Sequence, residues 1–275
     1  MLPGPRYPLA VPLPRKYSCS SGSSLFRRVF FLHLFTGRLS ETGHDAATAL
    51  EVEIASRARA AGVRLLGPNG MGIYHPRGRI AFRPDLPRSA GSVAFLSQSG
   101  NNAVEVVIRG AARGLHFGKV ANYGNGIDIT PSELLRYLAN DPETSAIGAY
   151  VEGVVDGRAF FEGLREAAVR KPVIIHKAGR TAAGARAAVS HTAALAGEAA
   201  VWSGVLRQSG AVQVSSQEQL LDLMVAVALL QGPQGRRTAV VGGGGGRSVQ
   251  SADACEEQGL TLSPLPKIVR VVIEE

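Results

Sequence analysis

The amino-acid sequence predicts an α/β protein built on a doubly wound parallel sheet. Short apolar runs alternate strictly with helical segments from about residue 91 onward. These runs are too uniformly apolar to have a solvated face, which is typical of parallel strands that are covered on both sides. The 33 glycines and the low aromatic content of 6% suit the many tight turns of such a fold. Right-handed crossovers would then place helices on both faces of the sheet.

Several of the predicted elements have a local start or stop signal. Gly62 is expected to end an early helix. Pro131 suits the first turn of a helix, where its missing N–H removes no hydrogen bond, and Thr130 before it suits the N-cap. Ser215 and Ser216 are candidate caps of a later helix. The predicted strands are 63–66, 92–96, 119–122, 147–151 and 173–177, and the predicted helices are 46–61, 101–113, 131–140, 158–170, 193–208 and 217–230.

Bulk composition limits the classes of function. A chain of 275 residues with 45% hydrophobic residues can bury a sizeable core. The net charge of +8 is concentrated at one end, because residues 1–40 hold six basic residues and no acid, which leaves +2 for the rest. The nearly neutral body makes a nucleic acid an unexpected partner. The apolar run at 29–35 is too short to cross a bilayer and lacks a cleavage site after it, so neither a membrane anchor nor a signal peptide is expected.

The two cysteines, Cys19 and Cys255, are far apart and have no metal-ligand spacing. This usage fits a reducing compartment, and we expect a cytoplasmic protein.

Two candidate parts of a site follow predicted strands. Ser99, Gly100 and Asn101 lie where a strand ends and a helix begins, so free N–H groups and the positive helix end could bind an anion; a serine cap and a turn glycine explain the same residues. Glu152 ends an apolar strand, where a carboxylate needs a partner. An imidazole N–H would serve, and the backbone N–H groups of a loop are the alternative.

The third candidate is His191, which stands just before a predicted helix between Ser190 and Thr192. On these residues alone, a helix cap or a solvated loop histidine is the simpler interpretation. Five motifs in order change that interpretation, because an ordered set is far more specific than any single motif. They are QSG at 98–100, GN-x-x-D at 124–128, YVE at 150–152, KPV-x-x-x-K-x-GR at 171–180 and SHT-x-x-LAG at 190–197.

From about residue 92 to 230, the sequence resembles the ligase domain of ADP-forming acetyl-CoA synthetases and succinyl-CoA synthetase alpha chains. The resemblance implies a flavodoxin-like ligase domain over 91–232, preceded at 39–90 by the C-terminal part of a Rossmann-like CoA-binding domain and followed at 233–275 by the start of a second flavodoxin-like domain. Residues 1–38 receive no fold and are expected to be disordered. Nothing in 1–38 resembles the CoA-gripping loop of the family, and the second flavodoxin-like domain is represented only by 233–275, so we expect a chain truncated at both ends.

The resemblance also implies roles for the candidate residues. His191 would carry the phosphoryl group as a phosphohistidine, and Glu152 would orient its imidazole. The helix end at Ser99, Gly100 and Asn101 would cradle the phosphate. A second helix end, at Gly243, Gly244 and Gly245, would face the phosphohistidine, although a plain flexible turn or a dinucleotide-binding turn shares this glycine-rich pattern. Asn69 and Asn125 would line the acyl or CoA site, with a turn-forming role as the alternative.

The implied activity is that of a nucleoside-diphosphate-forming carboxylate–CoA ligase, with coenzyme A, a small carboxylic acid and ATP or ADP as substrates. The sequence shows no segment resembling an ATP-grasp domain and no carboxylate cluster for Mg²⁺. The nucleotide and Mg²⁺ are therefore expected on an ATP-grasp partner subunit or domain. Two alternatives stay open: a non-catalytic truncated homologue, and a regulatory module that senses acyl-CoA.

Overall fold

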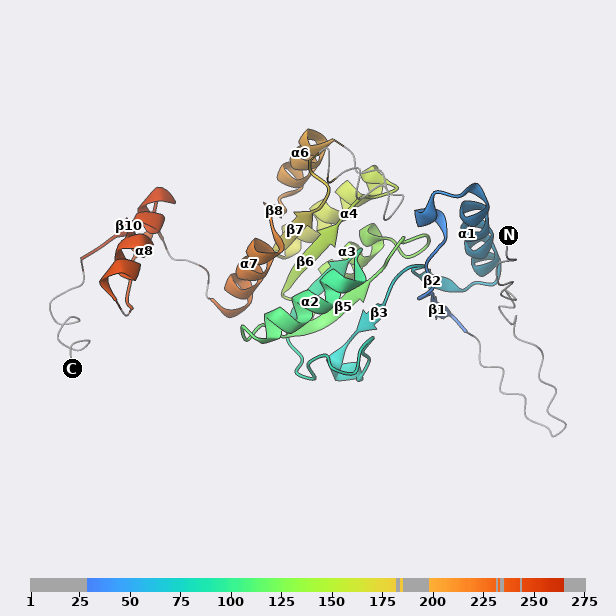
Figure 1. The fold of residues 1–275 in the computed structure, drawn as a ribbon, viewed down its shortest axis with the longest axis horizontal. Helices are drawn as coiled ribbons and strands as arrows, with labels where there is room; N and C mark the ends of the chain where they lie inside the picture. The colour runs from blue at the N-terminus through green and yellow to red at the C-terminus, as the bar shows by residue number, and fades with distance from the viewer. Residues whose placement is uncertain are drawn as a thin grey trace, which may run out of the picture.

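A computed structural model shows an α/β body with smaller segments at each end (Figure 1). Two of the predicted site residues, His191 and Gly243, lie outside the residues that the structure describes. The described residues are 29–181, 184, 198–230, 232, 235–242 and 244–264.

The body is a six-stranded sheet in the order β3-β5-β4-β6-β7-β8. Five strands are parallel, and β3 runs antiparallel to β5 at the edge. The predicted parallel α/β class is therefore confirmed, whereas β3 and β8 were not predicted. The strands are β3 (Gly72–Tyr74), β4 (Val93–Ser97), β5 (Phe117–Asn122), β6 (Ala146–Val151), β7 (Val173–Lys177) and β8 (Val212–Val214).

The connections make β4 the point where the strand order reverses. The chain moves from β4 to β5 on one side and then crosses to β6 on the other side of β4. In open sheets of this kind, ligands bind beyond the carboxyl ends of the two strands at which the order reverses. The carboxyl ends of β4 and β6 are thus the expected place for the site.

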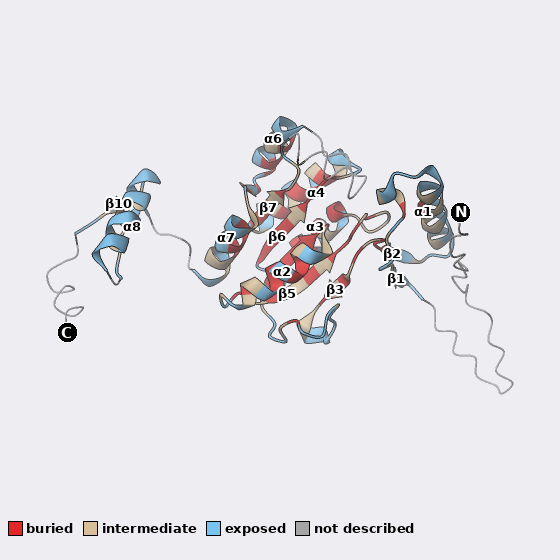
Figure 2. Ribbon diagram, in the orientation of Figure 1, coloured by how far each residue is buried: buried red, intermediate tan, exposed pale blue. Residues whose placement is uncertain are grey.

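Helices cover both faces of the sheet. One face carries α2 (Gly100–Ala111) and α7 (Gln217–Leu229), which pack on a core that includes Phe95 and Met224. The other carries α3 (Pro131–Asn140), α4 (Gly157–Arg170) and α6 (Ala199–Ser209), with Phe160 and Trp202 in its core. Figure 2 shows the buried residues gathered along the strands between these two helix layers. Burying each large apolar side chain here contributes about 1.5–3 kcal/mol.

The predicted caps are present. The Thr130 hydroxyl accepts the N–H of Glu133 at 3.3 Å, with Pro131 in the first turn of α3. The Ser216 hydroxyl accepts the N–H of Gln219 at 3.2 Å at the start of α7. Local sequence therefore fixes these two helix starts, because each cap satisfies an N–H group that the helix itself leaves unpaired.

Residues 29–38 correct part of the expectation for residues 1–38, of which 1–28 lie outside the described residues. Within 29–38, β1 (Phe31–His33) pairs in parallel with β2 (Arg64–Leu66), next to the helix α1 (Asp45–Ala60) and a short 3-10 turn, η1 (Ser40–Thr42). A three-residue strand shows no sustained periodicity, and its partner strand lies some thirty residues further along the chain. For these two reasons, β1 could not be predicted locally.

After the body, a short parallel pair of strands follows with one helix. It consists of β9 (Arg237–Thr238), α8 (Gly245–Glu257) and β10 (Thr261–Leu262). None of the described helices in any part of the chain combines the length and the apolar character needed to cross a membrane.

Candidate functional site at the carboxyl edge of the sheet

Two of the predicted site parts meet at the carboxyl ends of β4 and β6. Ser97 is in register with Tyr150, and the N–H of Gln98 donates to the carbonyl of Tyr150 at 3.1 Å. The start of α2 and the carboxylate of Glu152 therefore follow directly from neighbouring strand ends. The structure places them at the strand-order reversal, where the fold is expected to bind a ligand.

The N-terminus of α2 offers free donors. Ser99 is its N-cap but makes no side-chain cap hydrogen bond, and its carbonyl accepts the hydroxyl of Ser97 at 2.6 Å. Ser99 and Gly100 are half-buried and Asn101 is exposed. A Cβ on Gly100 would lie 2.8 Å from two atoms of the Met71 side chain. The helix end can thus accept an anion, and the glycine also has a packing reason of its own.

Glu152 is buried, and its backbone is held from both sides. The side-chain oxygen of Gln98 accepts the N–H groups of Glu152 at 2.8 Å and Gly153 at 3.1 Å. The ammonium of Lys177 donates to the carbonyl of Glu152 at 2.7 Å. These bonds come from the ends of β4 and β7, so the position of Glu152 is set by both neighbouring strands.

One oxygen of the Glu152 carboxylate lacks a hydrogen-bond donor in the described part of the chain. This atom, Oε2, is buried and has no hydrogen-bond partner within the described residues. A buried carboxylate oxygen without a donor is costly, so a donor is expected from outside that set. The predicted function assigns that donor to the imidazole of His191, whose position the structure does not describe.

Two tyrosines surround this carboxylate. Burial, and then the negative charge of Glu152, raise the pKa of Tyr150. Burial raises the pKa of Tyr123 as well, with further contributions from Glu152 and Tyr150. Both phenols are therefore neutral near pH 7 and can act only as neutral hydrogen-bonding groups. The Tyr123 hydroxyl is buried and also has no partner within the described chain.

The segment that follows β7 is anchored at its start. Arg180 donates to the carbonyl of Ser215 at 3.0 Å, which connects the residues after β7 to the approach to α7. After Gly184, the described residues continue at Glu198, the N-cap of α6. The stretch that contains His191 therefore leaves the sheet at β7, the strand next to β6.

Asn69 and Asn125 come together on the other side of β4, beyond β5. The Nδ2 atom of Asn69 lies 3.5 Å from the Oδ1 atom of Asn125. Asn125 donates to Glu41 at 2.8 Å and to Glu51 at 2.9 Å, so its amide is engaged with the N-terminal part. Burial tends to raise the pKa of Glu41, but hydrogen bonds from Asn125 and backbone N–H groups outweigh it and lower that pKa.

Asn69 also has the turn conformation of the alternative interpretation, with a φ of 55°. Its turn packs closely on the end of β5, where a Cβ on Gly124 would lie 2.0 Å from the carbonyl oxygen of Pro68. A binding role for Asn69 and Asn125 stays a prediction.

Asn122, which was not predicted, connects this turn to β4. It is fully buried, its Nδ2 atom donates to the carbonyl of Ser97 at 2.8 Å, and its Oδ1 atom accepts the N–H of Met71 at 2.5 Å. Its only sequence signal was a polar residue at the end of an apolar strand. The signal becomes informative only once β4, the strand beside Asn122, is known to lead into the helix cap at Ser99.

Asp128, the last residue of the GN-x-x-D motif, has a structural role. One of its oxygens accepts the N–H of Leu65 at 2.7 Å and the Nε–H of Arg64 at 2.9 Å. Arg64 also binds Glu133 through two hydrogen bonds of 2.8 and 2.7 Å. This motif therefore joins the end of β2 to the main domain.

At the other predicted helix end, Gly244 is the N-cap of α8 and Gly245 begins the helix. Whether this end faces a phosphate remains a prediction. Nowhere in the described chain do three or more His, Cys, Asp or Glu side chains form a group that could hold a metal ion.

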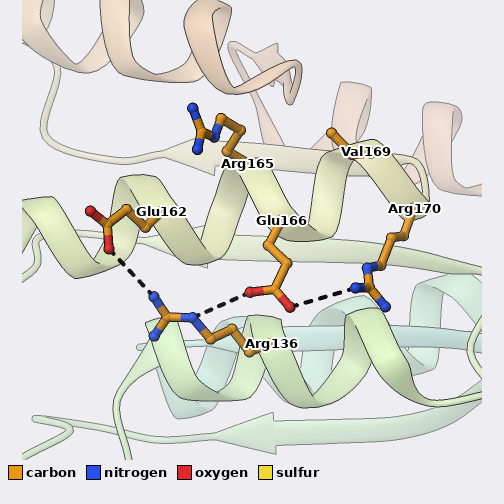
Figure 3. Close-up of a pocket in the computed structure, with 6 residues that line it drawn as sticks. All are labelled: Arg136, Glu162, Arg165, Glu166, Val169 and Arg170. Carbon is orange, nitrogen blue, oxygen red and sulfur yellow. Dashed lines mark ion pairs between the residues drawn. The ribbon is translucent and has the colours of Figure 1, made fainter.

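A separate surface pocket lies between α3 and α4 (Figure 3). Arg136 of α3 pairs with Glu162 at 3.9 Å and Glu166 at 3.5 Å, and Glu166 reaches Arg170 at 4.0 Å. These charges satisfy one another, and exposed pairs of this kind contribute only about 0–1 kcal/mol each. The pocket is therefore a weaker candidate than the carboxyl edge of the sheet.

Comparison with known proteins assigns a family to the region that contains this site. Residues 90–227 match the succinyl-CoA ligase like flavodoxin domain. The chain is 39% identical over 226 residues to ADP-forming acetate–CoA ligase I of Archaeoglobus fulgidus, with 81% of this chain and 32% of the relative covered. It is 36% identical over 230 residues to the alpha subunit of ADP-forming acetate–CoA ligase I of Pyrococcus furiosus, with 82% of this chain and 48% of that subunit covered.

A solved structure is also similar, namely a Ca. Korarchaeum cryptofilum dinucleotide-forming acetyl-coenzyme A synthetase 1 in complex with phosphate and ADP. It has a TM-score of 0.76 and 34% sequence identity, and the match covers 87% of this chain and 52% of that one. The chain thus spans between a third and half of the length of these relatives.

Proposed function

Because the chain belongs to the succinyl-CoA ligase like flavodoxin domain family, we propose that it is a subunit or fragment of a nucleoside-diphosphate-forming carboxylate–CoA ligase that works through a phosphohistidine. The observation that carries this proposal is the buried Glu152 carboxylate, which has an unpartnered oxygen beside the free N-terminus of α2. An oriented imidazole would satisfy that oxygen through one ring nitrogen and present the other to phosphorus. His191 is the proposed source of that imidazole.

The proposed reaction has three transfers. A ring nitrogen of His191 attacks the γ-phosphorus of ATP, the bond to the β,γ-bridging oxygen breaks, and ADP leaves with that electron pair. A carboxylate oxygen of the acid then attacks the phosphohistidine phosphorus, and the imidazole leaves to give an acyl phosphate. The thiolate of CoA attacks the acyl carbon, and inorganic phosphate leaves. The reverse sequence makes ATP from acyl-CoA, phosphate and ADP.

The residues of this chain contribute position and charge. Phosphoryl transfer requires mainly alignment and stabilisation of the transferred group, and little covalent chemistry from the protein. The N-terminus of α2 at Ser99, Gly100 and Asn101 supplies N–H donors for the phosphoryl oxygens. Glu152 keeps the imidazole in one tautomer and stabilises its cationic form. Gly243, Gly244 and Gly245 would supply a second helix end, and Asn69 and Asn125 would line the acyl or CoA site.

The substrates are then a small carboxylic acid, CoA and ATP or ADP, in the cytoplasm. The similar structure from Ca. Korarchaeum contains phosphate and ADP, and the similar Pyrococcus furiosus chain is named as an alpha subunit. We place the nucleotide and Mg²⁺ on an ATP-grasp partner subunit or domain.

The test is phosphorylation of the purified chain. It is incubated with the ATP-grasp subunit of an ADP-forming acetate–CoA ligase, Mg²⁺ and ATP labelled in its γ-phosphate. The expected product is protein-bound phosphate that is stable in base and labile in acid, and that is missing in His191→Ala. A wild-type chain that takes no label, with a subunit shown to label its own alpha subunit, would contradict the ligase proposal and favour the non-catalytic homologue.

A further inference from the structure

Lys177 is a buried lysine that the proposed chemistry does not use. It ends β7, and only 1% of its surface is exposed. Its Nζ atom donates to the carbonyl of Glu152 at 2.7 Å and also to the carbonyl of Ala178, and it lies 4.9 Å from the centre of the Trp202 ring. Two carbonyl oxygens and one aromatic face therefore surround an ammonium that has three N–H donors.

The two carbonyls and the aromatic face suit an ammonium donor, whereas burial opposes its charge. An ammonium buried in an apolar core destabilises the fold unless it is surrounded by acceptors, and a neutral side chain of similar length would often serve a core better. The Nζ atom lies over the ring of Trp202, which meets the ring of Phe160 edge to face at a centroid distance of 5.6 Å. Stability alone gives no reason for a charge in this position, so its contacts suggest another use.

Each of the three groups that Lys177 contacts lies in a segment that flanks the proposed phosphohistidine site. One is the backbone of Glu152, the proposed orienting carboxylate. Another is Ala178, in the stretch that leaves β7 toward His191. The third is Trp202 of α6, the helix with which the described chain resumes after His191. One ammonium thus joins the two ends of the stretch that carries His191 to the strand that carries Glu152.

We propose that Lys177 is a positioning residue of the phosphohistidine site, where its ammonium fixes Glu152 relative to both ends of the His191 stretch. The proposal rests on the proposed function above, because it assigns Lys177 no contact with substrate. Loss of the ammonium would leave the carbonyl of Glu152 without its donor from β7 and free the end of β6 to shift. Displacement of a catalytic group by about 1 Å can slow a reaction by about 100-fold.

The chain provides a matched control. Lys171 lies just before β7, and its Nζ atom also donates to two backbone carbonyls, that of Leu138 at 2.6 Å and that of Asp141. It therefore makes the same kind of contact at the opposite end of the strand, away from Glu152. In the labelling assay with ATP and the ATP-grasp subunit, Lys177→Met should lower the initial rate of phosphorylation between about 10-fold and 100-fold. Lys171→Met should label at the wild-type rate.

The pH profile distinguishes positioning from general support of the fold. Burial lowers the pKa of Lys177 to about 8, although the Glu152 carboxylate, the charged group acting on it, opposes this. The charge is therefore lost as the pH rises through about 8, and the bond to Glu152 weakens, because a neutral amine has one N–H fewer and is a weaker donor than an ammonium. The phosphorylation rate of the wild type should fall above about pH 8. The rate of Lys177→Met should show no such fall. Lys177→Arg, which keeps a cation and N–H donors, should recover part of the rate.

Protein stability should move in the opposite direction over the same pH range. The unfolded chain, with an ordinary lysine pKa of 10.5, binds more protons than the folded chain between about pH 8 and 10.5. The free energy of unfolding of the wild type, relative to Lys177→Met, should therefore rise with pH in this window. A rate that falls while relative stability rises supports positioning.

Four outcomes would overturn the inference. The first is labelling of Lys177→Met as fast as the wild type, and the second is a slow rate with the same pH profile as the wild type, which would mean general destabilisation only. If the wild-type chain itself takes no label, the proposed function fails and the role of Lys177 fails with it. Should Lys177→Met not fold, the wild-type profile and Lys177→Arg still decide: a wild-type rate that stays level through pH 8 contradicts the inference.

Discussion

The side-chain oxygen of Gln98 lies 2.8 Å from the backbone nitrogen of Glu152 and accepts its N–H. It also accepts the N–H of Gly153 at 3.1 Å. Gln98 is itself buried, so a single atom on the β4 end satisfies two backbone donors on the β6 end. The glutamine of the QSG motif thus sets the distance between the α2 N-terminus and the proposed orienting carboxylate.

The first prediction is that Gln98→Ala destabilises the protein and slows labelling of His191. Leaving two buried N–H groups unpaired at about 1–3 kcal/mol each should lower the free energy of unfolding by about 2–6 kcal/mol, measured by urea denaturation. The control is Gln219→Ala. Gln219 accepts two hydrogen bonds from Ser215 in an exposed position, and its loss should cost less than about 1 kcal/mol. Equal costs for the two variants would contradict the proposed role of Gln98.

The second prediction concerns Gly124, at the close contact between β5 and the turn that carries Asn69. Gly124 has a φ of 55°, and an added Cβ would lie 2.0 Å from the carbonyl oxygen of Pro68. Gly124→Ala should therefore destabilise the protein by the strain of a positive φ, about 1–2 kcal/mol, plus about 1–3 kcal/mol for the overlap. Gly114→Ala is the control, because Gly114 has a φ of 79° but its Cβ would lie 3.8 Å from Leu229.

Gly114→Ala should lose only the stability that corresponds to the strain of a positive φ. If thermal denaturation gives the same loss for both variants, the backbone of the Pro68 turn moves away freely, and the contact does not fix the position of Asn69.

The third prediction separates the two acids that bind Arg64. Asp128→Ala removes a salt bridge and also the acceptor of the Leu65 N–H, whereas Glu133→Ala removes only the ion pair with Arg64. Arg64 is half exposed, so the pair with Glu133 should contribute no more than about 1 kcal/mol. Asp128→Ala should cost about 1–3 kcal/mol. Asp128→Asn, which keeps an acceptor oxygen, should recover part of this loss.

The measurement is hydrogen exchange of the Leu65 N–H together with urea denaturation. Unchanged protection of Leu65 in Asp128→Ala would show that this hydrogen bond does not secure β2.

The fourth prediction is a pH dependence. The net lowering of the Glu41 pKa means that this group contributes stability above its unfolded value of 4.5 and that the contribution is lost as the pH falls through its lower folded value. Asn125→Asp would place a third carboxylate beside Glu41 and Glu51. It should lower the stability of residues 29–66 at pH 7. This loss of stability should shrink as the pH falls toward 4 and the carboxyl groups protonate.

Asn125→Ala removes the amide without adding charge, so the loss of stability that it causes should change less with pH. Limited proteolysis of residues 29–66 at pH 7 and pH 4 measures both variants. A loss of stability that is equal at the two pH values for Asn125→Asp would show that like-charge repulsion is not its cause.

Much of the fold follows from local pattern. The strand at Val173–Lys177 and the helix at Pro131–Asn140 have the predicted bounds, because the first is a continuous apolar run and the second has both a threonine cap and a proline in its first turn. The strands β1, β3 and β8 have three residues each and are specified by their pairing partners. Their sequences alone contain too few residues for a period to show.

The site divides in the same way. Glu152 and Ser99 were proposed because a polar residue after an apolar strand, and a serine before a helix, are local signals with a chemical meaning; their roles stay predictions. Gln98 and Lys177 belong to the predicted motifs, but the hydrogen bonds that they and Asn122 make could not be predicted, because each joins the side chain to the backbone of a distant segment. Which backbone it reaches depends on strand order.

The sequence by itself determined the α/β class, the order of the motifs and the chemistry that their residues can perform. The tertiary structure alone decided that β4 and β6 are neighbours and that Gln98 and Lys177 therefore hold Glu152 from opposite sides. Local propensity acts over a few residues, whereas these hydrogen bonds join groups 25 and 54 residues apart. Only folding of the whole sheet brings such groups within bonding distance.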